Sequence, residues 1–453
     1  MWRPVGKRCR NAGHIARGRG VTVMAFAVLL SAAIRMKAFE VTTGTLGTRV
    51  LNVRRMGLSS RYAAAPAEST LRPQQQGLDV KSAAASETRS ARDEANPRGF
   101  FERLGCPRYV AAPMVEHSEA AFRYLVRRHG ADLTYTQMIH SARFAPDNAH
   151  KFRKKCFDGI DEEEDRPLIV QFCGNDPDTV VQAARHVEGR VDAVDLNLGC
   201  PQKIAKKGNY GAFLLPKPDL CEKIIATMSR ELSVPVTVKI RALEKDADTL
   251  DLVRRLEGAG AQLLTVHGRT FRQAKTDQGV ANWDIIGKVK RAVSIPVVAN
   301  GGVETRADAE RILEATGADA VMSSEGLLED PSLFDRDLPP MDQLQGAEVA
   351  HRILALAAEY MELARRFPAP MGSIKGHLFK ILYRLLEYHH DLRNRLAHFE
   401  ADAAEADAVV REMCSRYYFD PDNRLPCDGM PRTWDPRISP KRWYRRHWDQ
   451  TSE

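Results

Sequence analysis

Short apolar segments alternate with amphipathic helical ones between residues 109 and 326. The apolar segments cover residues 109–115, 133–138, 168–174, 193–200, 236–241, 263–268, 297–302 and 320–326. Eight buried strands, each followed by a helix, over roughly 220 residues are typical of a (β/α)8 barrel. A doubly wound sheet is the alternative, but it would carry a glycine fingerprint after its first strand, and AAPMVEHS (111–118) is not one. The pattern therefore predicts an α/β chain built on a TIM barrel.

After the barrel, the apolar positions recur with a helical period. This period predicts helices over 346–366, 373–398 and about 401–418, with Pro368 and Pro370 separating the first two. The second helix has an apolar stripe made of Ile374, Leu378, Ile381, Leu382 and Leu385. We expect these helices to form a small all-α domain.

The N-terminal part has a different composition. Residues 1–65 are rich in Arg, Ala and Ser, have Glu40 as their one acid, and include an apolar stretch, 21–34, that is too short for a membrane span. These features favour an organellar presequence, plastid or mitochondrial, without stable membrane association of the mature protein. A disordered extension of a cytoplasmic or nuclear protein is the alternative.

The expected organisation follows from these patterns. The presequence (1–65) is followed by a flexible linker (66–100), the barrel (101–342), the helical domain (346–420) and a basic, aromatic tail (421–453).

The net charge of +8 comes from the presequence alone. Residues 1–67 contain 12 Lys/Arg and one acid, so the rest of the chain carries a net charge of −3. An RNA site would therefore be a local patch rather than a consequence of bulk charge.

The eight cysteines form no CxxC pair, which argues against a zinc module and a dense disulfide framework. We expect no metal and no obligate protein partner.

Polar residues follow the apolar core of each predicted strand. A barrel brings these carboxyl ends to one rim, where its catalytic groups lie. The rim residues are Pro113, Met114, Val115, Gln137, Gln171, Asn197, Cys200, Lys239, Arg241, His267, Arg269, Asn300, Gly301, Gly302, Ser324, Glu325 and Gly326. Folding alone does not account for this concentration of polar groups, so we expect a site here.

The glycines after the seventh and eighth strands indicate a phosphate site. Barrels commonly bind phosphate at these loops, although tight turns also need glycine for their own geometry. In combination with the Gln171 amide and the Lys239 ammonium, a phosphate site suggests flavin mononucleotide (FMN). Gln171 could pair with the pyrimidine edge of the flavin, and Lys239 could stabilise the negative charge of its reduced form. His267, followed by Gly268-Arg269, is interpreted as a flavin or phosphate ligand rather than a structural histidine.

Cys200 lies in the run Asn197–Gly211 (NLGCPQKIAKKGNYG). A buried structural cysteine is the usual role of this residue type. A nucleophile would need a base, and none is adjacent in sequence. A general acid needs a thiol that stays protonated at neutral pH, which cysteine provides without any perturbation. We therefore interpret Cys200 as a proton donor.

Two basic trios follow neighbouring rim positions. They are Lys203, Lys206 and Lys207 on one loop and Arg269, Arg272 and Lys275 on another. A solvated surface would explain each trio alone, whereas two trios at one mouth favour a nucleic-acid backbone.

The motifs together resemble the tRNA-dihydrouridine synthase family. The residues that carry the resemblance are AAPMV, ADLTYTQM, VQFCG, DLNLGCPQKIAKKGNYGAFL, PVTVKIR, LLTVHGRT, ANGGV and VMSSEG, in this order between about 107 and 340. The cysteine run and the SEG most resemble the eukaryotic enzymes that act on uridines 16 and 17.

The resemblance implies an FMN-containing barrel, a helical tRNA-binding domain and NADPH (or NADH) as reductant. It further implies that a hydride passes from flavin N5 to uracil C6 and that Cys200 protonates C5. The implied FMN positions are Pro113, Met114, Val115, Gln171, Lys239, His267, Asn300, Gly301, Gly302, Ser324 and Glu325. Many relatives have Gly-Arg in place of Ser324-Glu325, and an Asp or Asn in place of Gly302.

Further residues are candidates for tRNA contact. They are Asn197, Lys203, Lys206, Lys207, Arg241, Arg269 and Arg272 at the rim, and Lys375, Lys380 and Arg384 beside the stripe of the second C-terminal helix. The tail interleaves basic and aromatic residues over 431–448, which suits either RNA binding or packing on the helical domain.

Two other functions stay open at this point. One is a dihydroorotate-dehydrogenase-like FMN enzyme acting on a free pyrimidine, with the cysteine as base. The other is a non-catalytic tRNA-binding chaperone. The helical domain and the lysine-rich loop argue against the first, and the intact Cys200 and rim argue against the second.

Overall fold

The computed structural model describes residues 96–157, 163–273, 279–398, 403–429 and 437–443. These residues belong to one compact unit, Gln76–Glu453. The predicted presequence, most of the predicted linker and Lys275 lie outside the described residues. The described part of the linker enters helix α2 (Gly99–Arg103), which buries Phe100 and Phe101.

Parallel strands form the barrel, as predicted. They are β1 (Tyr109–Ala111), β2 (Thr134–Tyr135), β3 (Ile139–His140), β4 (Leu168–Cys173), β5 (Ala193–Leu198), β6 (Val236–Ala242), β7 (Leu263–Thr270), β8 (Val297–Asn300) and β9 (Ala320–Ser323). The strand order is β1-β9-β8-β7-β6-β5-β4-β2, and β3 also pairs with β4. A parallel bridge from Val110 to Leu133 closes the ring between β1 and β2.

The second barrel strand is interrupted, which corrects the continuous strand predicted over 133–138. Tyr135 is paired with Ile169, and Ile139 with Phe172, so one extra residue lies on the β2–β3 side. Such a bulge leaves residues unpaired and re-aims their side chains. Gln137, inside it, accepts from the Glu116 amide at 3.2 Å and donates to the Cys156 carbonyl at 3.4 Å. An apolar pattern does not reveal this interruption because the flanking positions stay buried.

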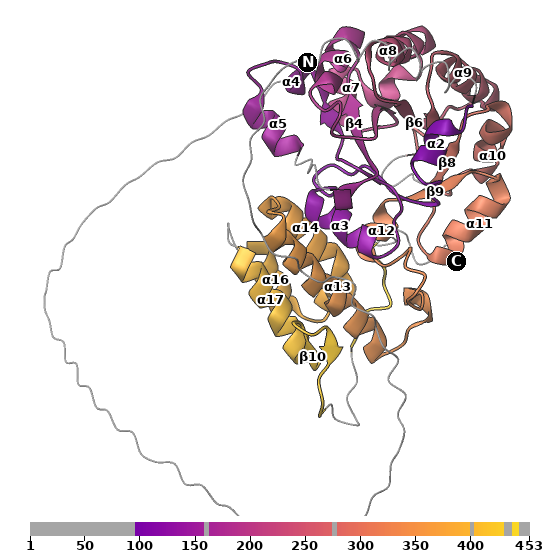
Figure 1. Cartoon of the computed structure of the whole chain (residues 1–453). Helices are drawn as coiled ribbons and strands as arrows, with labels where there is room; N and C mark the ends of the chain where they lie inside the picture. The colour runs from indigo at the N-terminus through magenta and orange to yellow at the C-terminus, as the bar shows by residue number, and fades with distance from the viewer. Residues whose placement is uncertain (1–95, 158–162, 274–278, 399–402, 430–436, 444–453) are drawn as a thin grey trace, which may run out of the picture. The chain divides into compact units, whose positions relative to one another are not determined.

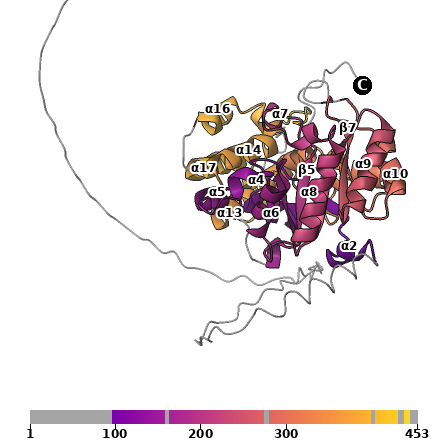
Figure 2. The ribbon, with the colours of Figure 1, turned by 90° about the horizontal axis from the view of Figure 1, so that it is seen from above.

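Helices surround the barrel, and short helices and turns lie in the loops between its strands (Figures 1 and 2). They are α3 (Ala120–Arg128), α4 (Ser141–Phe144), α5 (His150–Cys156), η1 (Glu163–Asp165), α6 (Pro177–Arg185), α7 (Lys203–Gly208), η2 (Gly211–Leu214), α8 (Pro218–Glu231), α9 (Asp246–Gly258), α10 (Trp283–Ala292), α11 (Arg306–Thr316) and α12 (Glu325–Glu329). Their ends follow local chemistry: α11 begins at a capping box of Thr305 and Asp308 and ends at Gly317 in the left-handed region.

The C-terminal part is helical, as predicted. After the turn η4 (Met341–Gln343) come α13 (Ala347–Arg366), α14 (Met371–Ile381), α15 (Tyr383–Leu386), α16 (His390–His398) and α17 (Ala403–Arg416), then the short hairpin of β10 (Phe419–Asp420) and β11 (Leu425–Pro426). The single helix predicted over 373–398 is wrong, because the chain leaves the helical conformation at Leu382 (ψ 2°) and again before His390. All five residues of the apolar stripe are nevertheless buried. The apolar period indicates which face of a helix is buried, but it does not reveal a single residue at which the helix breaks.

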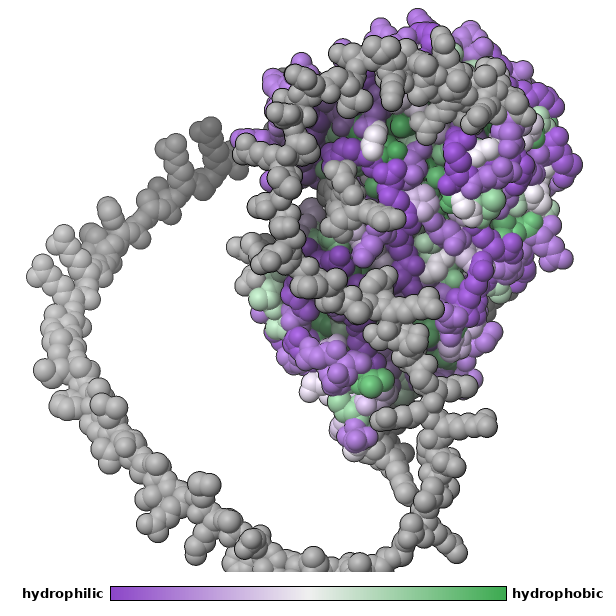
Figure 3. All heavy atoms as spheres, viewed as in Figure 1, coloured by the Kyte–Doolittle hydropathy of each residue, from purple (hydrophilic) through white to green (hydrophobic). Residues whose placement is uncertain are grey.

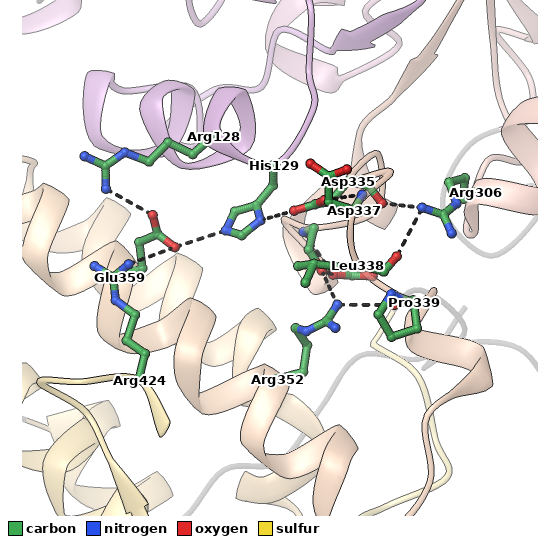
Figure 4. Close-up of polar contacts among 12 residues, drawn as sticks. Arg128, His129, Arg306, Asp335, Asp337, Leu338, Pro339, Arg352, Glu359 and Arg424 are labelled. Atoms are coloured by element: carbon green, nitrogen blue, oxygen red, sulfur yellow. Dashed lines mark hydrogen bonds and ion pairs between the residues drawn. The ribbon is translucent and has the colours of Figure 1, made fainter. Parts of the chain in front are cut away.

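Polar pairs and apolar packing join the helical part to the barrel. Helix α13 packs on α3 and α14 packs on α12. Glu119, before α3, accepts from the Tyr360 hydroxyl at 2.9 Å and pairs with His377 Nε2 at 3.1 Å, and all three side chains are buried. A second cluster, around His129 and Glu359, is drawn in Figure 4.

The visible outer face of the described residues is mostly hydrophilic (Figure 3). No helix in the described ranges is long and apolar enough to span a membrane. The same residues contain no group of three His, Cys, Asp or Glu that could hold a metal ion.

Candidate active site

Polar side chains form a connected network inside one end of the barrel. Alternate strand residues point to the same face, so Thr237, Lys239 and Arg241 of β6 all face inward. Strand register sets Asn197 beside Lys239, and Arg241 beside His267, which in turn is beside Asn300. The strand register therefore brings together five of the predicted rim residues: Asn197, Lys239, Arg241, His267 and Asn300.

Gln171 is bound on both sides of its amide and is fully buried. Its Nε2 donates to Asp195 at 2.8 Å, and its Oε1 accepts from Asn197 Nδ2 at 2.8 Å. Within the described residues both polar atoms thus have protein partners. A direct contact of Gln171 with a flavin stays a prediction.

Asp195 is a buried member of the network that the sequence analysis missed. It accepts from Gln171 and, at 2.7 Å, from the Thr237 hydroxyl. Burial outweighs these hydrogen bonds and raises the pKa of Asp195 to about 6. A signal was present in the sequence, because an acid in the middle of the apolar run AVDLNL is unusual for a buried strand.

The loop that carries Cys200 is held from both sides. Asn197 Oδ1 accepts from the backbone amides of Gly199 at 3.0 Å and Cys200 at 2.9 Å. Arg241 Nε donates to the Gly199 carbonyl at 3.0 Å. Gly211 has a φ of +63°, and a Cβ there would lie 2.8 Å from the Cys200 carbonyl oxygen. The thiol position is therefore set by Asn197, Arg241 and the glycine that closes the loop.

The surroundings of Cys200 favour the protonated thiol. Cys200 packs against the cluster of Cys173, Ala205 and Tyr210. Burial raises the pKa of Cys200, and a hydrogen bond from the Gln202 backbone and the nearby Arg241 and Lys239 only partly oppose this. A nucleophilic cysteine would need the opposite shift. The general-acid interpretation agrees with these electrostatics.

Lys239 is a half-buried cation of the site. Its Nζ donates to Asn300 Oδ1 at 3.0 Å, and Asn300 Nδ2 donates to the Met322 carbonyl at 2.9 Å. Burial, with a further contribution from Arg241, lowers the pKa of Lys239 to about 8. The ammonium form predominates at neutral pH, and a negative charge added nearby would favour this form further.

His267 is neutral in this site. Burial, together with Arg241 and Lys239, lowers its pKa well below the ordinary value. Its Nδ1 accepts from the Arg269 amide at 3.2 Å, which leaves the proton on Nε2. His267 therefore offers an Nε2–H donor rather than a positive charge.

The loop after β8 comes very close to the His267 ring. Gly301 has a φ of +114°, and a Cβ there would lie 3.0 Å from Ala281 Cβ and 3.1 Å from the His267 ring. Trp283 Nε1 donates to the Gly301 carbonyl at 2.9 Å and holds this turn. Gly302 has a φ of +78°, and a Cβ there would have no neighbour closer than 3.7 Å. The loop needs both glycines for their backbone conformation, and at Gly302 a Cβ would fit in ordinary contact with Trp283 and Ala281.

Two further rim loops carry the other predicted cofactor residues. Pro113 and Met114 are half-buried after β1, whereas Val115 is 48% exposed. The Val115 carbonyl bonds His117 Nδ1 at 3.0 Å. Ser324 and Glu325, both half-buried, begin α12 directly after β9.

The predicted RNA-contacting cations fall into two groups. Lys203, Lys206 and Lys207 are exposed on α7, and Arg272 is exposed beside Glu244. The others are engaged by protein groups: Arg241 and Arg269 by backbone carbonyls, Lys375 by the Ala397 carbonyl, Lys380 by His117 and the Gly376 carbonyl, and Arg384 by the Ser439 carbonyl. An RNA contact by this second group stays a prediction.

Comparisons with known proteins agree with the geometry. The family model described as Dihydrouridine synthase (Dus) matches residues 110–417. The chain is 43% identical over 336 residues to a mouse protein named tRNA-dihydrouridine(16/17) synthase [NAD(P)(+)]-like, which covers 73% of this chain and 68% of the mouse protein. It is 42% identical to the tRNA-dihydrouridine(16/17) synthases of Schizosaccharomyces pombe (66% of this chain, 75% of the relative) and Saccharomyces cerevisiae (68% and 72%). With the barrel, the helical part and the cysteine loop all in place, the chain belongs to the dihydrouridine synthase family.

Proposed function

We propose that this protein is a flavin-dependent oxidoreductase that reduces uridines 16 and 17 of tRNA to dihydrouridine with NAD(P)H. The single observation that carries the proposal is the setting of Cys200. Its thiol is held at the barrel rim by Asn197 and Arg241, and burial keeps it protonated beside the half-buried Lys239. The names of the 42–43% identical relatives support the two uridine positions and the nicotinamide reductant.

The residues of the rim fit FMN. Gly301 and Gly302 provide a turn that lets a ligand approach the backbone, as a phosphate site requires. His267 offers its Nε2–H there, and Lys239 with Asn300 would hold the electron-rich edge of the ring. Pro113, Met114 and Val115 lie on the loop after β1, and Ser324 and Glu325 lie directly after β9. When bound, FMN would supply the hydride for C6 of the uracil.

The protein's own contribution to the reaction is a proton and a positive charge. Cys200 donates its proton to C5, which requires the thiol form that burial favours. A neighbouring ammonium stabilises negative charge that develops during reduction, and the half-buried Lys239 is the candidate. Asn197 and Arg241 keep the thiol in one position, so that little reorganisation is needed when the substrate arrives.

We further propose that the tRNA is bound by local basic surface. The exposed lysines of α7 begin three residues after Cys200, so a nucleotide that reaches Cys200 brings its phosphates close to them. A base in a folded tRNA must leave its stack to reach a residue inside a barrel rim. The organellar location proposed from residues 1–65 has no further support, because these residues lie outside the described ranges.

Mapping of dihydrouridine in tRNA tests the proposal. Purified protein is incubated with NADPH and tRNA that lacks dihydrouridine, and the modified positions are read by reverse-transcription stops. We expect modification at 16 and 17 by the wild type and a loss of at least about 100-fold in Cys200→Ala, as for removal of a general acid. Cys173→Ala is the matched control, because it removes a neighbouring thiol that is not on the cysteine loop.

Each outcome bears on a separate part of the proposal. Full activity of Cys200→Ala would remove the general-acid assignment while leaving the enzyme class intact. Wild-type protein without bound flavin and without activity would favour the non-catalytic tRNA-binding alternative.

A further inference from the structure

The C-terminal segment Arg437–Trp443, the C-terminal strap, runs from the helical part onto the barrel. The Arg437 carbonyl accepts from the Tyr417 hydroxyl at 3.0 Å. Ser439 is buried, donates its amide to the Arg384 carbonyl at 3.0 Å and accepts from Arg384 Nε at 2.8 Å. These contacts fix the strap against α15 and the end of α17 before it reaches the barrel.

Arg442, near the end of the strap, joins two loops of the barrel rim. Its Nε donates to Glu329 Oε1 at 3.1 Å, and its Nη2 donates to the Glu304 carbonyl at 3.2 Å. Glu304 follows Gly301-Gly302 in the loop after β8, and Glu329 is the last residue of α12, which follows β9. The same guanidinium thus bridges the loops after the seventh and eighth barrel strands, where barrels commonly bind phosphate.

Arg442 also compensates buried negative charge. Glu304, Glu329 and Asp330 are only 7%, 6% and 5% exposed. Burial disfavours the charge of Arg442, yet the attraction of Glu329, Glu304 and Asp330 outweighs it and raises the pKa of Arg442. Without this cation, the carboxylates would add negative potential next to the loops that would hold a phosphate.

We propose that Arg442 is a positioning residue for the phosphate end of the flavin. It holds the Gly301-Gly302 loop and α12 at one spacing and neutralises the carboxylates behind them. This inference rests on the proposed function, because it requires FMN at the rim. It assigns a role in cofactor binding to a residue outside the barrel, in the tail whose function the sequence left open.

Flavin titration of the apoprotein tests the role of Arg442. The quenching of flavin fluorescence gives dissociation constants for FMN and for riboflavin, which lacks the phosphate. We expect Arg442→Gln to weaken FMN binding about tenfold or more, consistent with the loss of hydrogen bonds to charged groups, and to change riboflavin binding less than about twofold. Lys441→Gln is the matched control, because Lys441 is the exposed neighbour on the strap.

A charge-compensating variant separates positioning from a general effect on folding. In Arg442→Gln combined with Glu329→Gln, the uncompensated carboxylate is removed, so we expect part of the FMN affinity to return. Arg442→Lys keeps the charge and should bind FMN with intermediate affinity. Thermal unfolding of each apoprotein, measured alongside, identifies a variant that has lost its fold.

Three results would overturn the inference, and they differ from failure of the proposed function. Unchanged FMN affinity in Arg442→Gln would refute it directly. An equal loss of FMN and riboflavin affinity, or no recovery in the double variant, would show a structural role without selectivity for the phosphate. If the wild type binds neither flavin, the proposed function itself fails, and the inference fails with it.

Discussion

Removing the Glu359 carboxylate should destabilise the junction between the barrel and the helical part in a pH-dependent way (Figure 4). Glu359, on α13, bonds Arg128 at 3.0 Å and His129 Nε2 at 3.0 Å, and lies 3.5 Å from Arg424. His129 Nδ1 bonds Asp335 at 2.8 Å. The carboxylate is therefore shared by groups from other segments of the chain, and Glu359→Gln would remove its charge while keeping its size.

The size of the effect follows from the pKa of Glu359. Burial opposes ionisation, but hydrogen bonds from His129 and Arg128 outweigh it and lower the pKa from 4.5 to about 2. Each pKa unit corresponds to about 1.4 kcal/mol, so the interactions of the carboxylate are worth about 3 kcal/mol. Its side chain is only 8% exposed, so solvent screening reduces this value little. We expect Glu359→Gln to lower the free energy of unfolding by about 3 kcal/mol near pH 6.

The pH dependence has a defined sign. Burial opposes the charge of His129, but the bonds to Glu359 and Asp335 outweigh it and raise its pKa above 6.5. The stabilisation from His129 is thus fully present below pH 6.5 and is lost as the pH rises through the folded pKa. The stabilisation from Glu359 is present above pH 4.5 and is lost as the pH falls toward 2. The cluster should contribute most between these limits.

Urea unfolding at pH 6 and pH 9 measures this contribution. The cost of Glu359→Gln should be smaller at pH 9, because His129 is then neutral and only the arginines still require the carboxylate. Glu362→Gln is the matched control: Glu362 lies on the same helix, is 52% exposed and pairs with Arg424. We expect it to cost less than about 1 kcal/mol at either pH. Equal costs of Glu359→Gln at the two pH values would refute the role of His129, and a cost no larger than that of the control would refute the whole estimate.

Three further predictions concern the site and the core. Because burial and Arg241 lower the pKa of Lys239 to about 8, the rate of uridine reduction should decline above that pH. In a pH–rate profile, Lys239→Met should lower kcat/KM by about 100-fold and remove this alkaline decline. Gly301→Ala should lower the flavin content of the purified protein, measured by absorbance, because the new Cβ would lie 3.0 Å from Ala281 Cβ. Gly258→Ala is the control and should leave the flavin content unchanged, because a Cβ at Gly258 would have no neighbour within 4 Å. Arg123→Met should lower the free energy of unfolding, measured in urea, by about 3 kcal/mol. The side chains of Arg123 and its partner Asp165 are 1% and 0% exposed, and the change removes the bidentate partner of this buried carboxylate.

Much of the architecture could be predicted because burial leaves a periodic trace in the sequence. The parallel barrel, the helical C-terminal part and the family were confirmed. The bulge between β2 and β3 and the break at Leu382 were missed, since neither changes which residues are buried. At both places the backbone departs from ideal geometry over one or two residues, which the period of apolar positions does not show.

The grouping of residues at the rim follows from the order of strands along the chain. Strand ends of a closed parallel barrel must meet, so Cys200, Lys239, His267 and Asn300 could be grouped without coordinates. The hydrogen-bond partners of these groups, in contrast, depend on how the chain folds in three dimensions. It alone showed the thiol loop held by Asn197 and the bridge of Arg442 to Glu329, 113 residues apart in the chain. Hydrogen bonds and charge compensation depend on distances of a few ångströms between remote segments, and a linear pattern of apolar and polar positions contains no such distances.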